Sequence, residues 1–486
     1  MLMSRSTAAL LVLGLYGAAM IAMAFWGGRR THNGNDFFLA SRRLSTWFVA
    51  FSHTANATPA WLLLAFSGAA FTWGLSAVWI WIAVTAGYVL NGFYVAPRLR
   101  QLSVGQGSLT LTQVLSADGG DRLQPLIVRS AAFILSVTLL LEISAVLHLA
   151  SGVFADSMGF DKTSSCITAV AAIAIFALVG GFWSLTFSDV VQVAVMLLMA
   201  LIVPLVSLAV TNGFEQMQIG FGSLGPEMSD WFGGRGGVVA LAFVLGVCGF
   251  GYEIAGQPHA LNRYMAARDE STLRQARWIS LVLVAVLLAL TLLAGVSASV
   301  LYGGLQRSEL IFFAVVDRAM PPWLSAMLVT LVLGVLLMGM GNRLLVLASC
   351  LSVDMRRAVS PLSFAWARVV LVFYAVLALC LALYGGETLL NRAMFAFTAM
   401  GAAFGPLLLV RLTGKRVRPG STLGAMWAGF VLTLIFHVLP DAPGDFLERV
   451  FPFVAALGIA LTGGERRRNP DRADRSQETV HDRVPI

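Results

Sequence analysis

Three ionisable residues, Glu142, Glu253 and Arg343, lie in the middle of long apolar stretches of the sequence. A charged side chain inside a bilayer costs on the order of 2.5 to 3.5 kcal/mol on insertion scales, so each is expected to face a bundle interior beside a partner. A carboxylate in such a place can carry a proton across the membrane. A Glu–Arg pair that only holds helices together is the alternative, and the sequence leaves both open.

Polar residues, Gly and Pro interrupt two of these apolar stretches. The first interruption covers residues 51–61, FSHTANATPAW, and the second covers residues 248–258, CGFGYEIAGQP. Because every backbone polar group in lipid needs a partner, such a segment must line a cavity or pack against protein. Both interruptions predict broken helices whose unwound backbone faces a binding site, with Pro-kinked packing helices as the alternative.

The composition predicts a protein whose main solvent is lipid. Of 486 residues, 58% are hydrophobic and 12% charged, with a mean hydropathy of +0.80, whereas a soluble domain has about 25% charged residues. We predict an all-α integral membrane fold with about 13 transmembrane helices, since about 20 apolar residues span a bilayer. The predicted spans within residues 1–464 are roughly 8–28, 44–73, 75–97, 124–153, 163–183, 187–211, 236–258, 275–303, 322–352, 365–385, 389–411, 420–438 and 446–463.

The two interrupted stretches are five predicted spans apart. This offset predicts a core of two inverted five-helix repeats, about 44–211 and 236–411, each opening with a broken helix. The tail, residues 465–486, is polar and highly charged and is predicted to be disordered.

The net charge is +8, and its Lys and Arg residues concentrate in alternate predicted loops. This distribution indicates how the chain is oriented in the membrane. This pattern assigns Arg263 and residues 356–357 to cytoplasmic loops and Arg449 to a loop on the outer side, with the N-terminus outside and the C-terminus cytoplasmic. The sequence predicts no nucleic-acid binding, organic cofactor or enzymatic motif, and the four scattered Cys suggest neither a disulfide framework nor a metal site. The expected partners are a small solute and the lipid bilayer, and the oligomeric state stays open.

Four motifs resemble the sodium/solute symporter family, and most closely its bacterial sodium/proline symporters. They are residues 36–45 (DFFLASRRLS), 180–192 (GGFWSLTFSDVVQ), 256–266 (GQPHALNRYMA) and 404–408 (FGPLL). The resemblance implies 13 helices in a bacterial-type plasma membrane and inward solute transport with sodium, by alternating access between the second and seventh helices. It also implies that Gln257 and Pro258 end the unwound segment, where Gly256 permits close backbone approach.

The chain departs from the family at the positions that bind sodium, which prefers hard oxygen ligands. The carboxylate of the second helix in proline symporters falls on Ala57. The adjacent hydroxyls of the ninth helix fall on Met338 and Gly339. Asp189, at the position of an ion-release carboxylate, is retained. The residues left for ion coupling are Ala55 through its carbonyl, Thr58, Asp189, Glu253 and Arg343.

The solute pocket implied by the resemblance also differs from that of proline symporters. Glu142 replaces a tyrosine, and the two aromatic positions of the seventh helix become Phe250 and Ile254. The candidate solute-binding residues are Asn56, Thr58, Glu142, Phe250, Glu253 and Ile254. We expect a secondary transporter that imports a small zwitterion or cation, with Arg343 standing in for sodium or a carboxylate carrying a proton. A solute sensor that keeps the transporter fold is the alternative.

Overall fold

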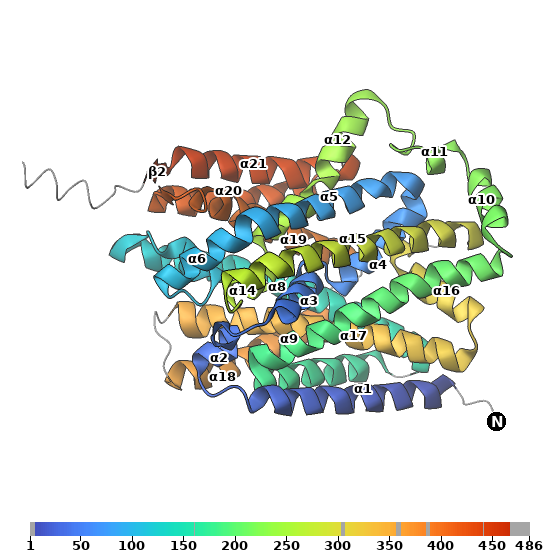
Figure 1. Ribbon diagram of the computed structural model, residues 1–486, viewed down its shortest axis with the longest axis horizontal. Helices are drawn as coiled ribbons and strands as arrows, with labels where there is room; N and C mark the ends of the chain where they lie inside the picture. Colours follow the sequence, from blue (N-terminus) through green and yellow to red (C-terminus); the bar gives the residue numbers. More distant parts are fainter. Residues whose placement is uncertain are drawn as a thin grey trace, which may run out of the picture.

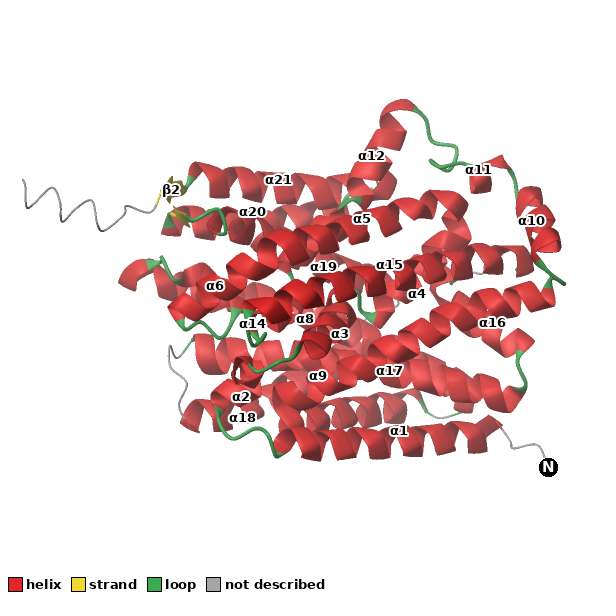
Figure 2. Ribbon diagram, viewed as in Figure 1, coloured by secondary structure: helices red, strands yellow, loops and turns green. Residues whose placement is uncertain are grey.

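The computed structural model describes residues 5–159, 161–302, 307–355, 361–384, 389–440 and 442–466, and it is a bundle of long helices lying side by side (Figure 1). The predicted charges at residues 356–357 and most of the tail, from residue 467 onward, lie outside the described residues. Two short strands, β1 (Lys415–Val417) and β2 (Gly464–Arg466), pair antiparallel beside the helices (Figure 2).

The long helices form the body of the bundle. They are α1 (Arg5–Gly28), α4 (Ala60–Trp73), α5 (Val78–Val89), α6 (Ala96–Gln106), α8 (Gly120–Met158), α9 (Lys162–Val210), α12 (Gly237–Val247), α15 (Glu270–Leu301), α17 (Pro322–Ser349), α18 (Pro361–Tyr384), α19 (Leu389–Arg411), α20 (Pro419–Val438) and α21 (Phe446–Thr462). The remaining helices join or interrupt them: α2 (Gly34–Leu39), α3 (Thr46–Ala57), α7 (Leu111–Ser116), α10 (Phe214–Ser223), α11 (Pro226–Ser229), α13 (Gly249–Tyr252), α14 (Pro258–Met265) and α16 (Ile311–Ala319).

Within the described residues, 10 helices are long and apolar enough to cross a membrane. Two of them, Ala60–Gln106 and Lys162–Val210, have 47 and 49 residues, roughly twice the ~20 residues that one crossing needs. The first passes through a 3-10 turn at Gly74–Ala77, and α9 bends at Gly181 (φ 55°, ψ −150°). These bends fall near predicted boundaries between spans. Helix α21 corresponds to the last predicted span, but its 17 residues are fewer than the ~20 that one crossing needs. The total of about 13 spans therefore stays a prediction.

The bend in α9 depends on a glycine. Gly181 has a positive φ, which residues other than glycine rarely adopt, and a Cβ there would lie 2.6 Å from the Phe37 ring. The bend therefore lets α2 pack directly on α9.

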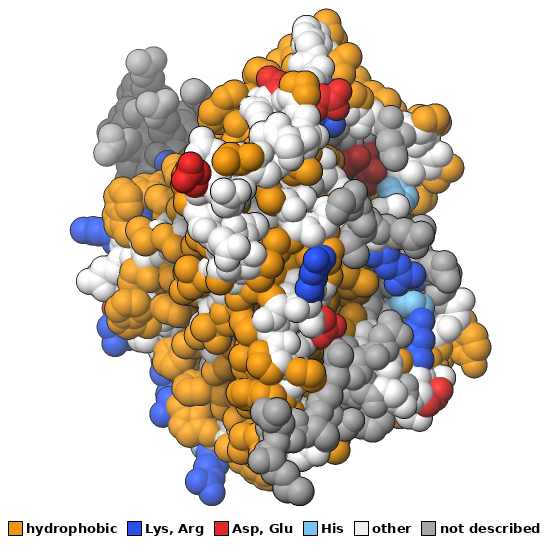
Figure 3. Space-filling view, turned by 90° about the vertical axis from the view of Figure 1, so that its right-hand side faces the viewer, with side chains coloured by type: hydrophobic (Ala, Val, Ile, Leu, Met, Phe, Trp, Pro, Cys, Tyr) orange, Lys and Arg blue, Asp and Glu red, His pale blue; other side chains and the backbone are white. Residues whose placement is uncertain are grey.

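The centre of the bundle is built around α9, α17 and α19. Helix α9 packs against α1, α15 and α17, while α19 packs against α8, α20 and α21. Helices α1 and α21 lie at opposite edges in Figure 1. Apolar side chains are exposed along the outer helices, for example Leu15 at 65% and Phe25 at 62%. Figure 3 views the bundle from one end of its helices, and orange apolar side chains gather there on the left flank. Such a surface suits surroundings of acyl chains.

Candidate functional site

The first interruption separates α3 from α4. Helix α3 ends at Ala57, Thr58 leaves the helical region (φ −128°, ψ 72°), and α4 begins after Pro59. Proline has no backbone N–H and cannot continue the hydrogen bonding of α3. The Thr58 hydroxyl lies 2.9 Å from the Tyr88 hydroxyl, so it is engaged with α5.

The second interruption separates α12 and α13 from α14. A 3-10 turn covers Glu253–Gly256, Gln257 is extended (φ −93°, ψ 101°), and α14 begins at Pro258. Gln257 Nε2 donates to the Phe397 carbonyl at 2.8 Å. A Cβ on Gly256 would lie 2.7 Å from the Cα of Gly401, so this segment touches the backbone of α19.

Glu142 of α8 and Arg343 of α17 form a fully buried ion pair. Arg343 Nη2 lies 2.8 Å from Glu142 Oε1, and Arg343 Nε donates to the same oxygen at 3.0 Å. Trp61 Nε1, just after the first interruption, also donates to this oxygen at 2.8 Å. Glu142 Oε2 is buried with no hydrogen-bond partner among the described residues.

Arg343 also touches one of the two α17 positions where the resemblance to proline symporters places sodium ligands. Its Nη1 donates to the Gly339 carbonyl at 3.0 Å. A Cβ on Gly339 would lie 3.2 Å from Gln192 Nε2, whereas Met338 is 6% exposed and lines an apolar cavity. Ala57 is fully buried. The structure therefore brings a guanidinium, and no side-chain oxygen of α17, to the Gly339 backbone.

Glu253 pairs with a different arginine. Arg449 Nη1 lies 3.3 Å from Glu253 Oε2, and the Thr398 hydroxyl donates to the same oxygen at 3.3 Å. The assignment of Arg449 to an outer loop is wrong, because it lies in the first turn of α21 and is 2% exposed. Its guanidinium stacks 3.8 Å above the Phe250 ring, so Phe250 faces α21.

Asp189 of α9 is the centre of a third buried cluster. It accepts hydrogen bonds from Asn342 Nδ2 at 2.9 Å and Asn56 Nδ2 at 3.0 Å, and also from the Ser52 hydroxyl. Arg263 Nη2 lies 3.2 Å from Asp189 Oδ2. Arg263 is 1% exposed within α14, so its assignment to a cytoplasmic loop is also wrong.

The candidate residues thus divide among three clusters. Glu142 and Arg343 meet near Trp61, Glu253 and Phe250 meet at α21, and Asn56 meets Asp189. Ala55 and Ile254 are buried in the apolar core. Trp61, Arg263, Asn342 and Arg449 were not among the candidates. An indole directly after a helix break was an available signal for Trp61, but the partners of the arginines depend on packing between distant segments.

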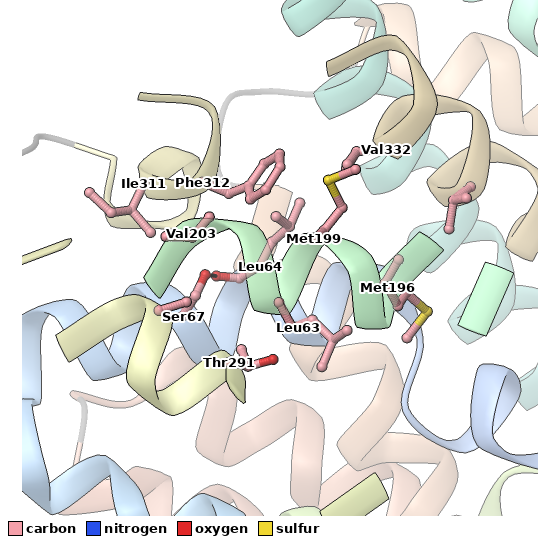
Figure 4. A pocket seen from close by; sticks show the side chains of 14 residues that line it. Leu63, Leu64, Ser67, Met196, Met199, Val203, Thr291, Ile311, Phe312 and Val332 are labelled. Atoms are coloured by element: carbon pink, nitrogen blue, oxygen red, sulfur yellow. Dashed lines mark hydrogen bonds between the residues drawn. The ribbon is translucent and has the colours of Figure 1, made fainter. Parts of the chain in front are cut away.

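A cavity of about 250 Å³ reaches the first cluster from one end of the bundle, with Trp61 and Leu64 in its wall. Its other wall is formed by α8 and α19, and it carries the charged residues Lys162, Arg307 and Glu309. A smaller apolar cavity of about 60 Å³ is also lined in part by α4 (Figure 4). Its lining includes Leu63, Met196 and Phe312. Of these two cavities, the larger one has the charged lining, and its wall residue Trp61 donates to Glu142.

Comparison with known proteins confirms the resemblance carried by the motifs. The model of the sodium:solute symporter family matches residues 37–431. The chain is 27% identical over 472 residues to the osmoregulated proline transporter OpuE of Bacillus subtilis, covering 95% of each protein. It is 28% identical over 481 residues to the sodium/proline symporter of Salmonella typhimurium, covering 94% of this chain and 93% of the relative.

Solved transporters share the fold. A substrate-bound, outward-open Na+-coupled sialic acid symporter matches with a TM-score of 0.80 at 16% identity, covering 95% of this chain and 99% of that one. Mhp1, a nucleobase-cation-symport-1 family transporter in a closed conformation, matches with a TM-score of 0.56 at 14% identity, covering 88% and 92%. At these identities the match concerns the fold alone.

Proposed function

The chain belongs to the sodium:solute symporter family, and from this premise we propose that it imports a small organic solute by alternating access without a bound sodium ion. The family and the fold are those of membrane-embedded secondary transporters rather than enzymes. The solute, the coupling and the orientation, with the N-terminus outside a bacterial-type plasma membrane and the C-terminus cytoplasmic, are parts of the proposal.

The observation that carries the proposal is the position of the Arg343 guanidinium. It donates to the Gly339 carbonyl at 3.0 Å and pairs with Glu142 at 2.8 Å. A carbonyl and a carboxylate are the hard oxygens that a bound cation attracts. A tethered guanidinium supplies the same positive charge permanently, so a mobile cation is not needed to hold α8 and α17 together.

The same pair favours a zwitterionic or cationic solute. Glu142 has a buried oxygen without a hydrogen-bond partner among the described residues. It lies beside Trp61, a residue in the wall of the cavity of about 250 Å³. A solute ammonium can pair with this carboxylate, while a solute carboxylate can share Arg343. Solute entry would then exchange partners within the pair instead of leaving a charge uncompensated.

Glu253 is the proposed proton carrier. Its Oε1 is buried without a hydrogen-bond partner among the described residues, and Glu253 begins the 3-10 turn at the second helix interruption. Uptake in proteoliposomes should collapse with a proton uncoupler more than with sodium removal. Glu253→Gln should abolish transport or remove its pH dependence, and an unchanged variant with full pH dependence would exclude Glu253.

A solute sensor is the second candidate, favoured by the changed residues at Ala57, Met338 and Gly339. A thermal-shift screen of amino acids, amines and carboxylates identifies ligands, because ligand binding to the folded state raises its stability. Flux of a bound compound into proteoliposomes supports the transporter. Tight binding without flux would favour the sensor.

A further inference from the structure

A third cavity, of about 420 Å³, lies between α1, α9 and α17 and is separate from the buried ion pairs. Its lining is almost entirely apolar and includes Tyr16, Met20, Phe176 and Met338. The three helices lie side by side in the lower part of Figure 1. The Tyr16 ring packs so closely on α17 that a Cβ on Gly334 would lie 2.7 Å from it.

The cavity opens sideways. Ile21 of α1 and Ile175 of α9 are 58% and 59% exposed, whereas Phe176 and Met338 at the back are 3% and 6% exposed. The mouth therefore lies on the apolar outer surface of the bundle, and the back wall is formed by α9 and α17. In a membrane-embedded transporter, the medium outside this mouth is the hydrocarbon of the bilayer.

The wall contributed by α9 changes from polar to apolar along the helix. Ser164, Ser165 and Thr168 occupy its first two turns, and Ala172 and Phe176 follow. From Ser164 to Phe176 the helix rises about 18 Å, at about 1.5 Å per residue. This is about half of the ~30 Å hydrocarbon core. The cavity thus has the length and the polarity gradient of one leaflet.

We propose that this cavity binds one acyl chain of a bilayer phospholipid, with the glycerol end near Ser164 and the methyl end against Met338. Apolar walls of this size favour a hydrocarbon occupant, because an empty space gives up the dispersion contacts of every atom that lines it. Met338 stands where the resemblance places a hydroxyl ligand for sodium. Its thioether side chain instead provides an apolar contact surface for the acyl chain. The next residue along the helix is Gly339, and Arg343 follows four residues after Gly339.

Photo-crosslinking tests the proposal. The purified protein is placed in nanodiscs of phosphatidylethanolamine that carries a diazirine near the end of one acyl chain, irradiated and mapped by peptide mass spectrometry. We expect adducts on Met338 or Leu337, which are both only 6% exposed. Adducts confined to exposed positions outside the cavity, such as Leu15 and Phe25, would overturn the proposal.

Two tryptophan substitutions provide a matched pair. Ala172 lines the cavity, whereas its neighbour Ala171 is exposed and does not line it. Ala172→Trp should remove the adducts on α17, while Ala171→Trp should keep them, with thermal unfolding of each variant as the check on folding. Persistence of the Met338 adduct in a folded Ala172→Trp protein would also contradict the proposal. Labelling requires no solute flux, so its outcome is independent of the transport experiments.

Discussion

Two of the buried carboxylate–arginine pairs, Glu142–Arg343 and Glu253–Arg449, differ in what surrounds each guanidinium. Glu142–Arg343 joins α8 to α17, whereas Glu253–Arg449 joins the interruption before α14 to α21, outside the predicted repeats. Arg449 has a second carboxylate nearby, since Asp445 Oδ2 lies 3.4 Å from its Nη2, and it also stacks on Phe250. Within the described residues, Arg343 has one carboxylate and the Gly339 carbonyl.

This difference separates two roles. Neutralising Glu253 leaves Arg449 partly compensated, so this carboxylate can change its protonation state while the fold holds. Neutralising Glu142 leaves Arg343 without a carboxylate in a buried site, and such a site opens readily only when another charge replaces the lost one. We therefore propose the first pair for solute exchange and the second for proton transfer.

Of the proposed substitutions, Arg343→Met should have the largest effect on stability and uptake. It leaves Glu142 buried and unpaired, which should lower the free energy of unfolding by about 3 to 5 kcal/mol and abolish uptake. Thermal unfolding in detergent and uptake in proteoliposomes measure the two effects. The double variant Glu142→Met/Arg343→Met should regain the lost stability without regaining transport. A double variant that transports at the original rate would show that the pair is only structural.

Glu142→Gln and Glu253→Gln break the two pairs in the same chemical way. We expect Glu142→Gln to cost about 3 to 5 kcal/mol of stability, because it leaves a buried guanidinium uncompensated. Glu253→Gln should cost about 1 to 3 kcal/mol, since Asp445 still faces Arg449. Parallel melting curves decide the order. Equal losses, or a larger loss for Glu253→Gln, would remove the distinction between the pairs.

Trp61→Phe sharpens the account of the first pair. It keeps an aromatic ring in the cavity wall but removes the indole N–H that donates to Glu142 at 2.8 Å. A hydrogen bond to a charged group contributes about 1.5 to 3 kcal/mol, so stability should fall by an amount in this range. Solute affinity should change as well, which equilibrium binding of the screened ligand measures. A change in neither quantity would place Trp61 outside the site.

Gly339→Ser should have the smallest effect. The added Cβ meets only the flexible end of Gln192 at 3.2 Å, and stability should change by about 1 kcal/mol or less. Restoring a hydroxyl here should not create sodium dependence, because Arg343 still occupies the Gly339 carbonyl. Uptake that becomes sodium-dependent in this variant would show that the missing hydroxyl, and not the guanidinium, decides the coupling.

Local features of the sequence predicted the all-α membrane fold, the family and the positions where the helices are interrupted. Pro59 and Pro258 interrupt helices because proline lacks a backbone N–H, and this effect depends only on the local sequence. The repeat boundaries and the roles of the candidate residues stay predictions.

The partners of the charges could not be predicted in the same way. Arg449 follows Asp445 and Glu448 at the edge of an apolar stretch, a pattern typical of a loop, yet it reaches Glu253 across 196 positions of sequence. In the sequence, Arg263 resembles a loop arginine that indicates membrane topology, because Arg268 and Arg274 are nearby. In the structure, α14 packs it against Asp189. Both pairings depend on how distant helices pack, which periodicity and composition do not encode.

The most direct test of the central claim is the sodium dependence of uptake by the unmodified protein. Proteoliposomes are loaded with the solute from the ligand screen, and counterflow of the labelled solute is measured in sodium chloride and in N-methylglucamine chloride. With Arg343 in place of the ion, the initial rate should be the same in both media. A rate that requires sodium would contradict the account.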